Sequence, residues 1–117
     1  IGGQPGWLPY CQAVQFMIAD SAMELHMCRL LVYECAWRSD QGEDVRNLSY
    51  MVKVMCAEMA GRVVDRSMQV HGGVGLTRDL PLEWWYRQVR SLRITEGPSE
   101  VLRWRLAQHL IKSHPGA

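Results

Sequence analysis

Two long stretches in which apolar residues recur every three or four positions constrain the fold of this chain most. This period is typical of an α-helix that buries one face. The first stretch covers about residues 12–38, and a polar segment with a central glycine follows it at 39–44. We therefore predict a long helix over 12–38 whose buried face carries Val14, Met17, Ile18, Ala22, Leu25, Cys28 and Val32.

The second stretch predicts another long helix over about residues 46–71. Residues of opposite charge stand four positions apart at Glu58 and Arg62, and again further on at Glu83 and Arg87. Such pairs face each other on a helix surface and stabilise it slightly. The predicted buried face of the second helix carries Met51, Val54, Met55, Ala57, Gly61, Val64 and Met68.

Two shorter helices are predicted near the C-terminus, over about residues 81–90 and 98–113. Pro81 and Pro98 stand at their starts, where a missing N–H costs least. No segment alternates with period two for long enough to form a strand. We predict an all-α fold, an antiparallel helix bundle, preceded by a glycine- and proline-rich loop over residues 1–10.

Composition narrows the class of protein further. The chain has 117 residues, enough for one domain, and 13 basic against 12 acidic residues give a net charge of +1. This balance gives no argument for binding nucleic acid or an anionic membrane. The longest apolar runs are shorter than the roughly 20 residues of a membrane span. No metal site is predicted, and the four cysteines indicate buried, reduced thiols in a cytosolic or organelle-matrix protein: Cys11, Cys28, Cys35 and Cys56.

A glycine-rich segment follows the second predicted helix, at Gly72-Gly73-Val74-Gly75. Phosphate-binding loops of this kind usually follow a strand, whereas this one follows a helix. Two interpretations remain open. The glycines supply left-handed conformations that end the helix, in a loop over about 72–80, or their backbone contacts a phosphate.

An acidic segment, Arg93-Ile94-Thr95-Glu96-Gly97-Pro98-Ser99-Glu100, leads into the last predicted helix. A helix N-terminus favours the charged form of a carboxylate beside it. From these residues alone, Glu96 is an acidic residue at a helix start. A chemical role needs the neighbouring motifs as well.

Five short motifs follow one another along the chain. They are Gln12-Ala13-Val14-Gln15-Phe16 with Ala19-Asp20, then Gln69-Val70-His71-Gly72-Gly73-Val74-Gly75, then Leu80-Pro81-Leu82-Glu83, then Arg87, then Arg93-Ile94-Thr95-Glu96-Gly97. Their order and spacing are similar to those of the C-terminal domain of acyl-CoA dehydrogenases, and this likeness covers about residues 11–112.

The resemblance implies a flavin-dependent enzyme in which Glu96 is the catalytic base. In that family, the glutamate of the Glu-Gly pair removes the α-proton of an acyl-CoA thioester, and FAD accepts the β-hydride. Such a base must be kept out of bulk water when substrate is bound. Gly97 allows close backbone approach, and the N–H of the glutamate donates to the thioester oxygen.

The resemblance also implies the cofactor contacts and the partners. Gln69, Gly72 and Gly73 would contact the ADP portion of FAD, often a flavin held mainly by a neighbouring subunit. The expected partners are an acyl-CoA substrate, an electron-transfer flavoprotein or similar acceptor, and further copies of the chain in a dimer or tetramer. Residues expected beside the flavin near Glu96 are Pro98, Ser99 and Glu100.

The chain departs from the family pattern at three points. Thr95 stands where tyrosine is common, Pro98 replaces a threonine, and residues 1–10 hold no match for the flavin-contacting arginine. The N-terminal helical domain, the β-barrel and the first long helix of the bundle also have no counterpart here. We therefore expect a piece of a longer protein, which alone is inactive and exposes apolar surface. The alternatives are an acyl-CoA oxidase of the same fold and a non-catalytic helical interaction module.

Overall fold

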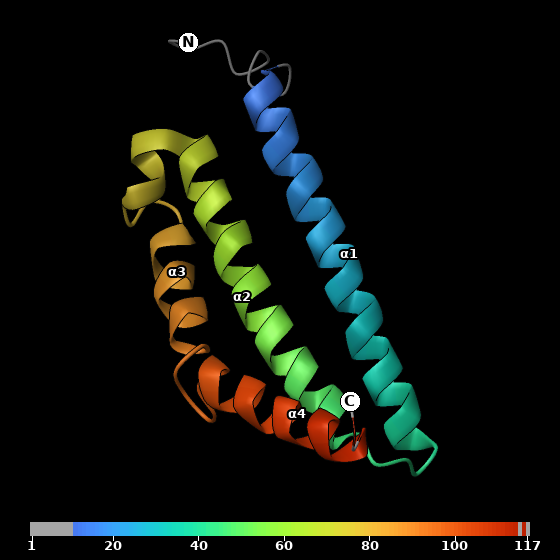
Figure 1. The fold of residues 1–117 in the computed structure, drawn as a ribbon. Helices are drawn as coiled ribbons and strands as arrows, with labels where there is room; N and C mark the ends of the chain where they lie inside the picture. Colours follow the sequence, from blue (N-terminus) through green and yellow to red (C-terminus); the bar gives the residue numbers. More distant parts are fainter. Residues whose placement is uncertain (1–10, 115, 117) are drawn as a thin grey trace.

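The computed structural model describes residues 11–114 and 116. It confirms the predicted all-α fold, because helices and turns, and no strand, make up the described residues. The elements follow one another along the chain in Figure 1 as α1 (Gln12–Asp40), α2 (Arg46–His71), the 3-10 turn η2 (Gly72–Leu76), α3 (Leu82–Ser91) and α4 (Ser99–Ser113). The loop predicted over residues 1–10 lies outside the described residues.

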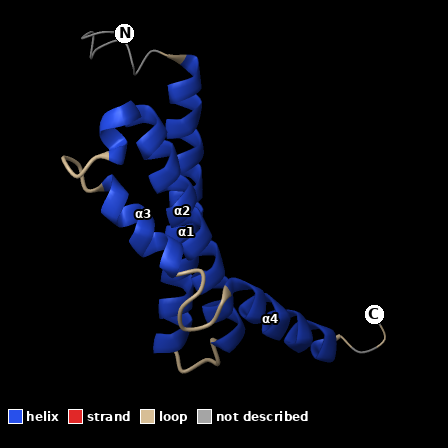
Figure 2. Cartoon of the chain, turned by 90° about the vertical axis from the view of Figure 1, so that its left-hand side faces the viewer, coloured by secondary structure: helices blue, strands red, loops and turns tan. Residues whose placement is uncertain are grey.

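Helix α2 is the centre of this arrangement. Helix α1 runs antiparallel along one side of it, and α3 and α4 pack on the other side (Figure 1). Among the described elements, α1 contacts α2 alone. Helix α4 runs obliquely away from the α1–α2 pair (Figure 2). The radius of gyration, 18.1 Å, therefore exceeds the roughly 13–14 Å of a close-packed domain of this length.

The buried core is small because α1 has a single partner helix. Of the face predicted to be buried on α1, only Cys28 is buried, while Ile18, Leu25 and Val32 are 56%, 43% and 39% exposed. The prediction was wrong for these three and for Ala22, since one neighbour covers only a narrow strip of a helix. The buried apolar residues are Cys28, Val54, Ala57, Met59, Leu82 and Leu102.

Salt bridges tie the outer helices to α2. Glu24 of α1 accepts hydrogen bonds from Arg66 at 2.8 Å and from Arg62 at 3.0 Å. Glu58 of α2 accepts two bonds of 2.7 Å from Arg103 of α4. Glu58 and Arg62 therefore form no salt bridge with each other, because each binds a partner on another helix. These hydrogen bonds lower the pKa of Glu24, through Arg66 first, and the pKa of Glu58, through Arg103 first. The predicted attraction between Glu58 and Arg62 is still present, since the charge of Arg62 helps to lower the pKa of Glu58.

The second predicted pair is confirmed, since Glu83 and Arg87 of α3 lie 3.3 Å apart. The helix ends lie within two residues of the predicted positions. Pro81 and Pro98 each stand one residue before the first helical residue, as N-caps. The predicted loop after α2 differs more, because it begins with the ordered turn η2.

All four cysteines have free thiols, but the prediction that they are buried holds for Cys28 alone. Cys11, Cys35 and Cys56 are half-buried. Burial still raises the pKa of the Cys56 thiol to about 11, helped by the neighbouring Cys28. Within the described residues, no helix has the length and apolar character needed to cross a membrane.

Candidate active site at the end of α3

The loop between α3 and α4 holds Glu96 in a conformation that L-amino acids rarely adopt. Its φ is 52°, and no other non-glycine residue in the described part of the chain has a positive φ. The left-handed conformation costs roughly 1–2 kcal/mol for such a residue. The side chain of Glu96 is nevertheless exposed. Strain kept at an exposed residue suggests a functional constraint.

Gly97 is required at its position for two separate reasons. Its φ is 104°, and a Cβ built there would lie 3.0 Å from Cδ2 of Leu102. Leu102 is buried in the first turns of α4, so it has little room to move. The N–H of Ser99, a residue only 3% exposed, donates to the carbonyl of Arg93 at 3.1 Å. The loop therefore closes tightly onto the start of α4.

A cation from α2 reaches into this loop from the other side. The ammonium Nζ of Lys53 donates to the carbonyl oxygens of Leu92 at 2.6 Å, Thr95 at 3.0 Å and Gly97 at 3.1 Å. These carbonyls lie beyond the last turn of α3, where the helix supplies no N–H partner and a cation is favourable. Sequence reasoning missed Lys53. The available signal was a single charge in the apolar run 51–57.

The glycine turn η2 is held by its own neighbours. Gly72 has φ 67°, and its N–H donates to the carbonyls of Met68 and Gln69. A Cβ at Gly75 would lie 2.9 Å from the Met68 carbonyl, so this glycine is required by packing. Gly73 has neither a positive φ nor an atom that a Cβ would meet. The prediction of a left-handed conformation was correct for Gly72 and wrong for Gly73.

A cleft of about 580 Å³ opens beside η2 and includes the three residues predicted to contact FAD. The amide of Gln69, the bare surface of the glycines and the ring of Tyr86 fit a nucleotide portion of a cofactor. The N–H of Gly72 is already bonded, and the carboxylate of Asp65 disfavours phosphate near it. The amide of Gln69 and the bare surfaces of Gly72 and Gly73 are thus the contacts that remain. The cleft is lined by Asp65, Met68, Gln69, Gly72, Gly73, Leu76 and Tyr86.

The structure does not bring the two sets of predicted site residues together. Glu96, Gly97 and Pro98 lie in the loop before α4, and Ser99 and Glu100 are the first two residues of α4. The turn η2, beside which the cleft opens, lies at the other end of α3 (Figure 1). Lys53 and Gln69 mark the two regions on α2. At the helical rise they are roughly 24 Å apart along its axis.

This all-helical fold, with a strained glutamate in one loop and an open glycine turn in another, matches a known protein family. The family model described as "Acyl-CoA dehydrogenase, C-terminal domain" matches residues 6–111. The chain belongs to this acyl-CoA dehydrogenase family and corresponds to its C-terminal domain.

Individual relatives agree with that assignment. The chain is 46% identical over 101 residues to (R)-benzylsuccinyl-CoA dehydrogenase of Thauera aromatica, covering 86% of this chain and 25% of that protein. It is 37% identical over 103 residues to the bovine mitochondrial short-chain specific acyl-CoA dehydrogenase, covering 88% of this chain and 25% of that protein. Among solved structures, the FAD complex of PigA superimposes with a TM-score of 0.85 at 26% identity. The match covers 91% of this chain and 28% of the PigA chain. The chain thus spans about a quarter of the length of these proteins.

Proposed function

We propose that this chain is the catalytic-base domain of a FAD-dependent acyl-CoA dehydrogenase that introduces an α,β double bond into an acyl-CoA thioester. The observation that supports this most is Glu96, a carboxylate kept in a left-handed conformation on an exposed loop. FAD, when bound, supplies the hydride acceptor. Because the chain spans only about a quarter of its relatives, we propose that it is inactive alone.

Glu96 offers two groups to the substrate in this proposal. Its carboxylate takes the proton from Cα, the C–H electrons of Cβ leave as hydride, and the Cα–Cβ double bond remains. Its N–H has no acceptor among the described residues and can donate to the thioester oxygen. Such a donor stabilises the negative charge that develops on that oxygen as the proton leaves.

The cofactor contacts are proposed in two groups. Gln69, Gly72 and Gly73 contact the nucleotide portion of FAD, and Gly73 fits because no contact among the described residues requires a glycine there. Pro98 and Glu100 are exposed and lie near Glu96, on the flavin side. Ser99 is buried, so we assign it to support of the loop rather than to flavin contact.

The separation of these groups along α2 supports an assembly of several copies. Copies in a dimer or tetramer can bring the cleft of one subunit to a flavin used by the loop of another. The electrons then pass to an electron-transfer flavoprotein or a similar acceptor. An acyl-CoA oxidase would pass them to oxygen instead, and reoxidation of the reduced enzyme by air distinguishes the two.

The test uses the intact protein and the variant Glu96→Gln. We expect flavin absorbance and acyl-CoA-dependent dye reduction in the wild type. Glu96→Gln should lower kcat by about 10³-fold without loss of flavin, because positioned proton transfer contributes roughly 10²–10⁴-fold. Glu34→Gln, an exposed glutamate on α1, is the matched control and should retain activity.

The substrate class is tested with two acyl-CoA thioesters, one aryl-substituted and one short and unbranched. The names of the two relatives suggest this choice. Protein without flavin and without acyl-CoA-dependent reduction would refute the proposal. Unchanged flavin absorbance and dye reduction in Glu96→Gln, compared with the wild type, would favour the non-catalytic interaction module.

A further inference from the structure

We propose that Lys53 is a positioning residue that aims the backbone of Glu96 at the substrate. The inference rests on the proposed function of Glu96 and adds a residue from a different helix to that site. Lys53 lies in α2 beside the buried Val54, and its ammonium ends among three carbonyls of the Glu96 loop. No ion pair of Lys53 with a carboxylate occurs in the described residues. Its charge is therefore directed at the main chain.

The bond to the Thr95 carbonyl has a direct consequence for Glu96. This carbonyl and the N–H of Glu96 belong to one peptide group, and all peptide bonds of the described residues are trans. In a trans peptide the C=O and N–H point in opposite directions. Lys53 thus fixes the Thr95 oxygen on the α2 side and directs the Glu96 N–H away from α2. A cation on the oxygen also polarises the peptide and makes its N–H a stronger donor.

The other two bonds hold the ends of the same loop. The Leu92 carbonyl lies where α3 ends, and the Gly97 carbonyl lies just before α4. An ammonium carries three donors on one atom and can bind three converging acceptors, whereas the planar guanidinium of arginine cannot match that arrangement. Because both ends and the middle of the loop are attached to α2, these bonds restrain Glu96 from changing to a right-handed conformation.

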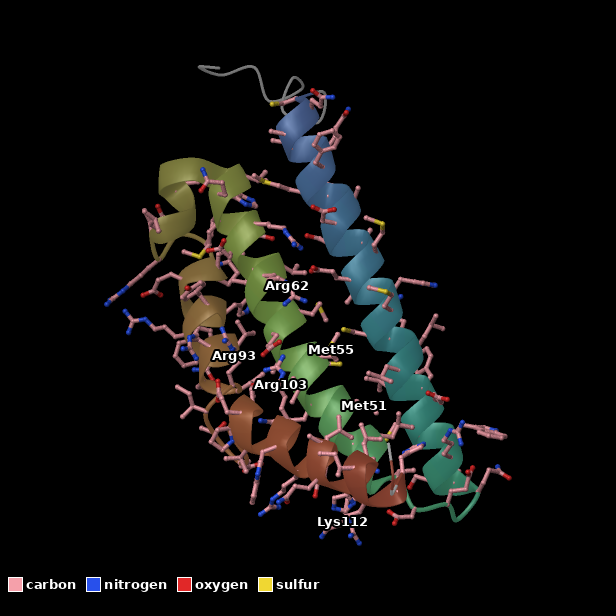
Figure 3. The ribbon with its side chains drawn as sticks, in the orientation of Figure 1. Met51, Met55, Arg62, Arg93, Arg103 and Lys112 are labelled. Carbon is pink, nitrogen blue, oxygen red and sulfur yellow. The ribbon has the colours of Figure 1, made fainter. Side chains whose placement is uncertain are left out.

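Amide hydrogen exchange tests the positioning without flavin or substrate. Several amides of this segment are bonded within the chain, and two of them serve as reporters of its opening, the N–H of Thr95 to Ser91 and the N–H of Ser99 to Arg93. In the intact protein, Lys53→Met should speed the exchange of both by at least ~10-fold. Lys112→Met is the matched control, since Lys112 lies on the last turn of α4 (Figure 3) and should leave these amides unchanged. Equal exchange in Lys53→Met and wild type would overturn the inference.

Kinetics test whether the positioning serves Glu96. Lys53→Met should lower kcat by about 10²-fold with KM nearly unchanged, as expected for a misplaced catalytic group. In the Glu96→Gln background the same substitution should cause a clearly smaller further loss, because the carboxylate that it misplaces is already absent and only the N–H of residue 96 remains to be misplaced. A full 10²-fold loss in both backgrounds would show a general structural effect and refute the inference.

Lys53→Arg keeps the experiment decisive if Lys53→Met does not fold. It retains a cation but loses the three-way contact, so faster exchange at Thr95 and Ser99 and a lower kcat are expected. Wild-type values for both would refute the inference. If the wild type lacks acyl-CoA-dependent reduction while Lys53→Met still speeds the exchange, the proposed function fails and the structural role of Lys53 stands.

Discussion

The two loops at the ends of α3 are held in opposite ways. The η2 turn is fixed by adjacent sequence: Gly72 has a positive φ at the end of α2, and Gly75 lies against Met68 in the last turn of α2. The loop before α4 is fixed from α2, where Lys53 binds carbonyls about 40 positions later in the chain. The first loop therefore needs small residues, whereas the second needs a distant cation and tolerates a strained glutamate.

The two loops have different requirements in the proposed site. At the η2 turn the glycines leave the backbone accessible, so a ligand can approach it closely without any side chain being held in a particular direction. The Glu96 loop has to present one N–H and one carboxylate in a fixed direction. Precision of that kind comes from contacts with a rigid neighbouring helix.

The largest effect should come from Gly97→Ala, compared with Gly73→Ala. A Cβ at residue 97 meets Leu102 and forces a side chain into φ 104°, so we expect a loss of about 1–3 kcal/mol in the free energy of unfolding. Turnover should fall by about 10²-fold as Glu96 moves. Gly73→Ala should change stability by less than about 0.5 kcal/mol and weaken flavin retention instead. Urea unfolding measures the stability of the two variants, and flavin absorbance measures how much flavin they retain. Equal destabilisation by Gly97→Ala and Gly73→Ala would show that the two loops do not differ in this way.

Gly75→Ala tests whether the glycine turn is held by its own packing. The new Cβ would lie 2.9 Å from the backbone oxygen of Met68, which can yield only if α2 shifts. We expect a loss of about 1–3 kcal/mol, as for other overpacked sites. Hydrogen exchange should rise at η2 and stay unchanged at Thr95 and Ser99. A rise at those two amides as well would show that the loops are coupled through α3.

The sequence predicted the elements of this fold well, because helical periodicity and proline positions are local signals. It also predicted Glu96 and the glycine turn as candidate site segments, through motifs of short range. The sequence-based predictions failed where contacts between residues far apart in the chain determine burial or the choice of a salt-bridge partner. The face of α1 is exposed because only α2 covers it, and Glu58 binds Arg103 rather than Arg62. The role of Lys53 was not predicted for the same reason, since no residue near position 53 in the sequence indicates the carbonyls that Lys53 binds.

A smaller effect, of opposite sign, is expected at Glu96 itself. Glu96→Gly removes the left-handed strain, although glycine also loses more chain entropy on folding. We expect a net gain of a few tenths to about 1 kcal/mol in the free energy of unfolding, together with loss of turnover. Glu100→Gly in the first turn of α4 is the control and should destabilise by about 1 kcal/mol. A loss of stability in Glu96→Gly would mean that the conformation at residue 96 is not strained.

The smallest effect concerns a second anchor of the Glu96 loop, the salt bridge of Glu58 with Arg103. Figure 3 shows Arg103 and Arg93 near each other beside α2, and both lower the pKa of Glu58, Arg103 mainly through its hydrogen bond. A folded-state pKa below the ordinary glutamate value of 4.5 gives stability that is present above that pH. This stability is lost as the pH falls through the lower folded value.

Acid should therefore loosen the start of α4 before it affects η2. Between about pH 5 and pH 3, exchange at the Ser99 amide, corrected for the intrinsic pH dependence, should rise more than exchange within η2. Arg103→Met should remove most of this difference and cost a few tenths to about 1 kcal/mol at neutral pH, because Arg103 is 52% exposed. The pKa of Glu24 is also lowered, by its hydrogen bond to Arg66 first, but its bonds to Arg62 and Arg66 join α1 to α2 rather than to the loop. An equal acid response in the wild type and Arg103→Met would leave Lys53 as the principal anchor of the loop.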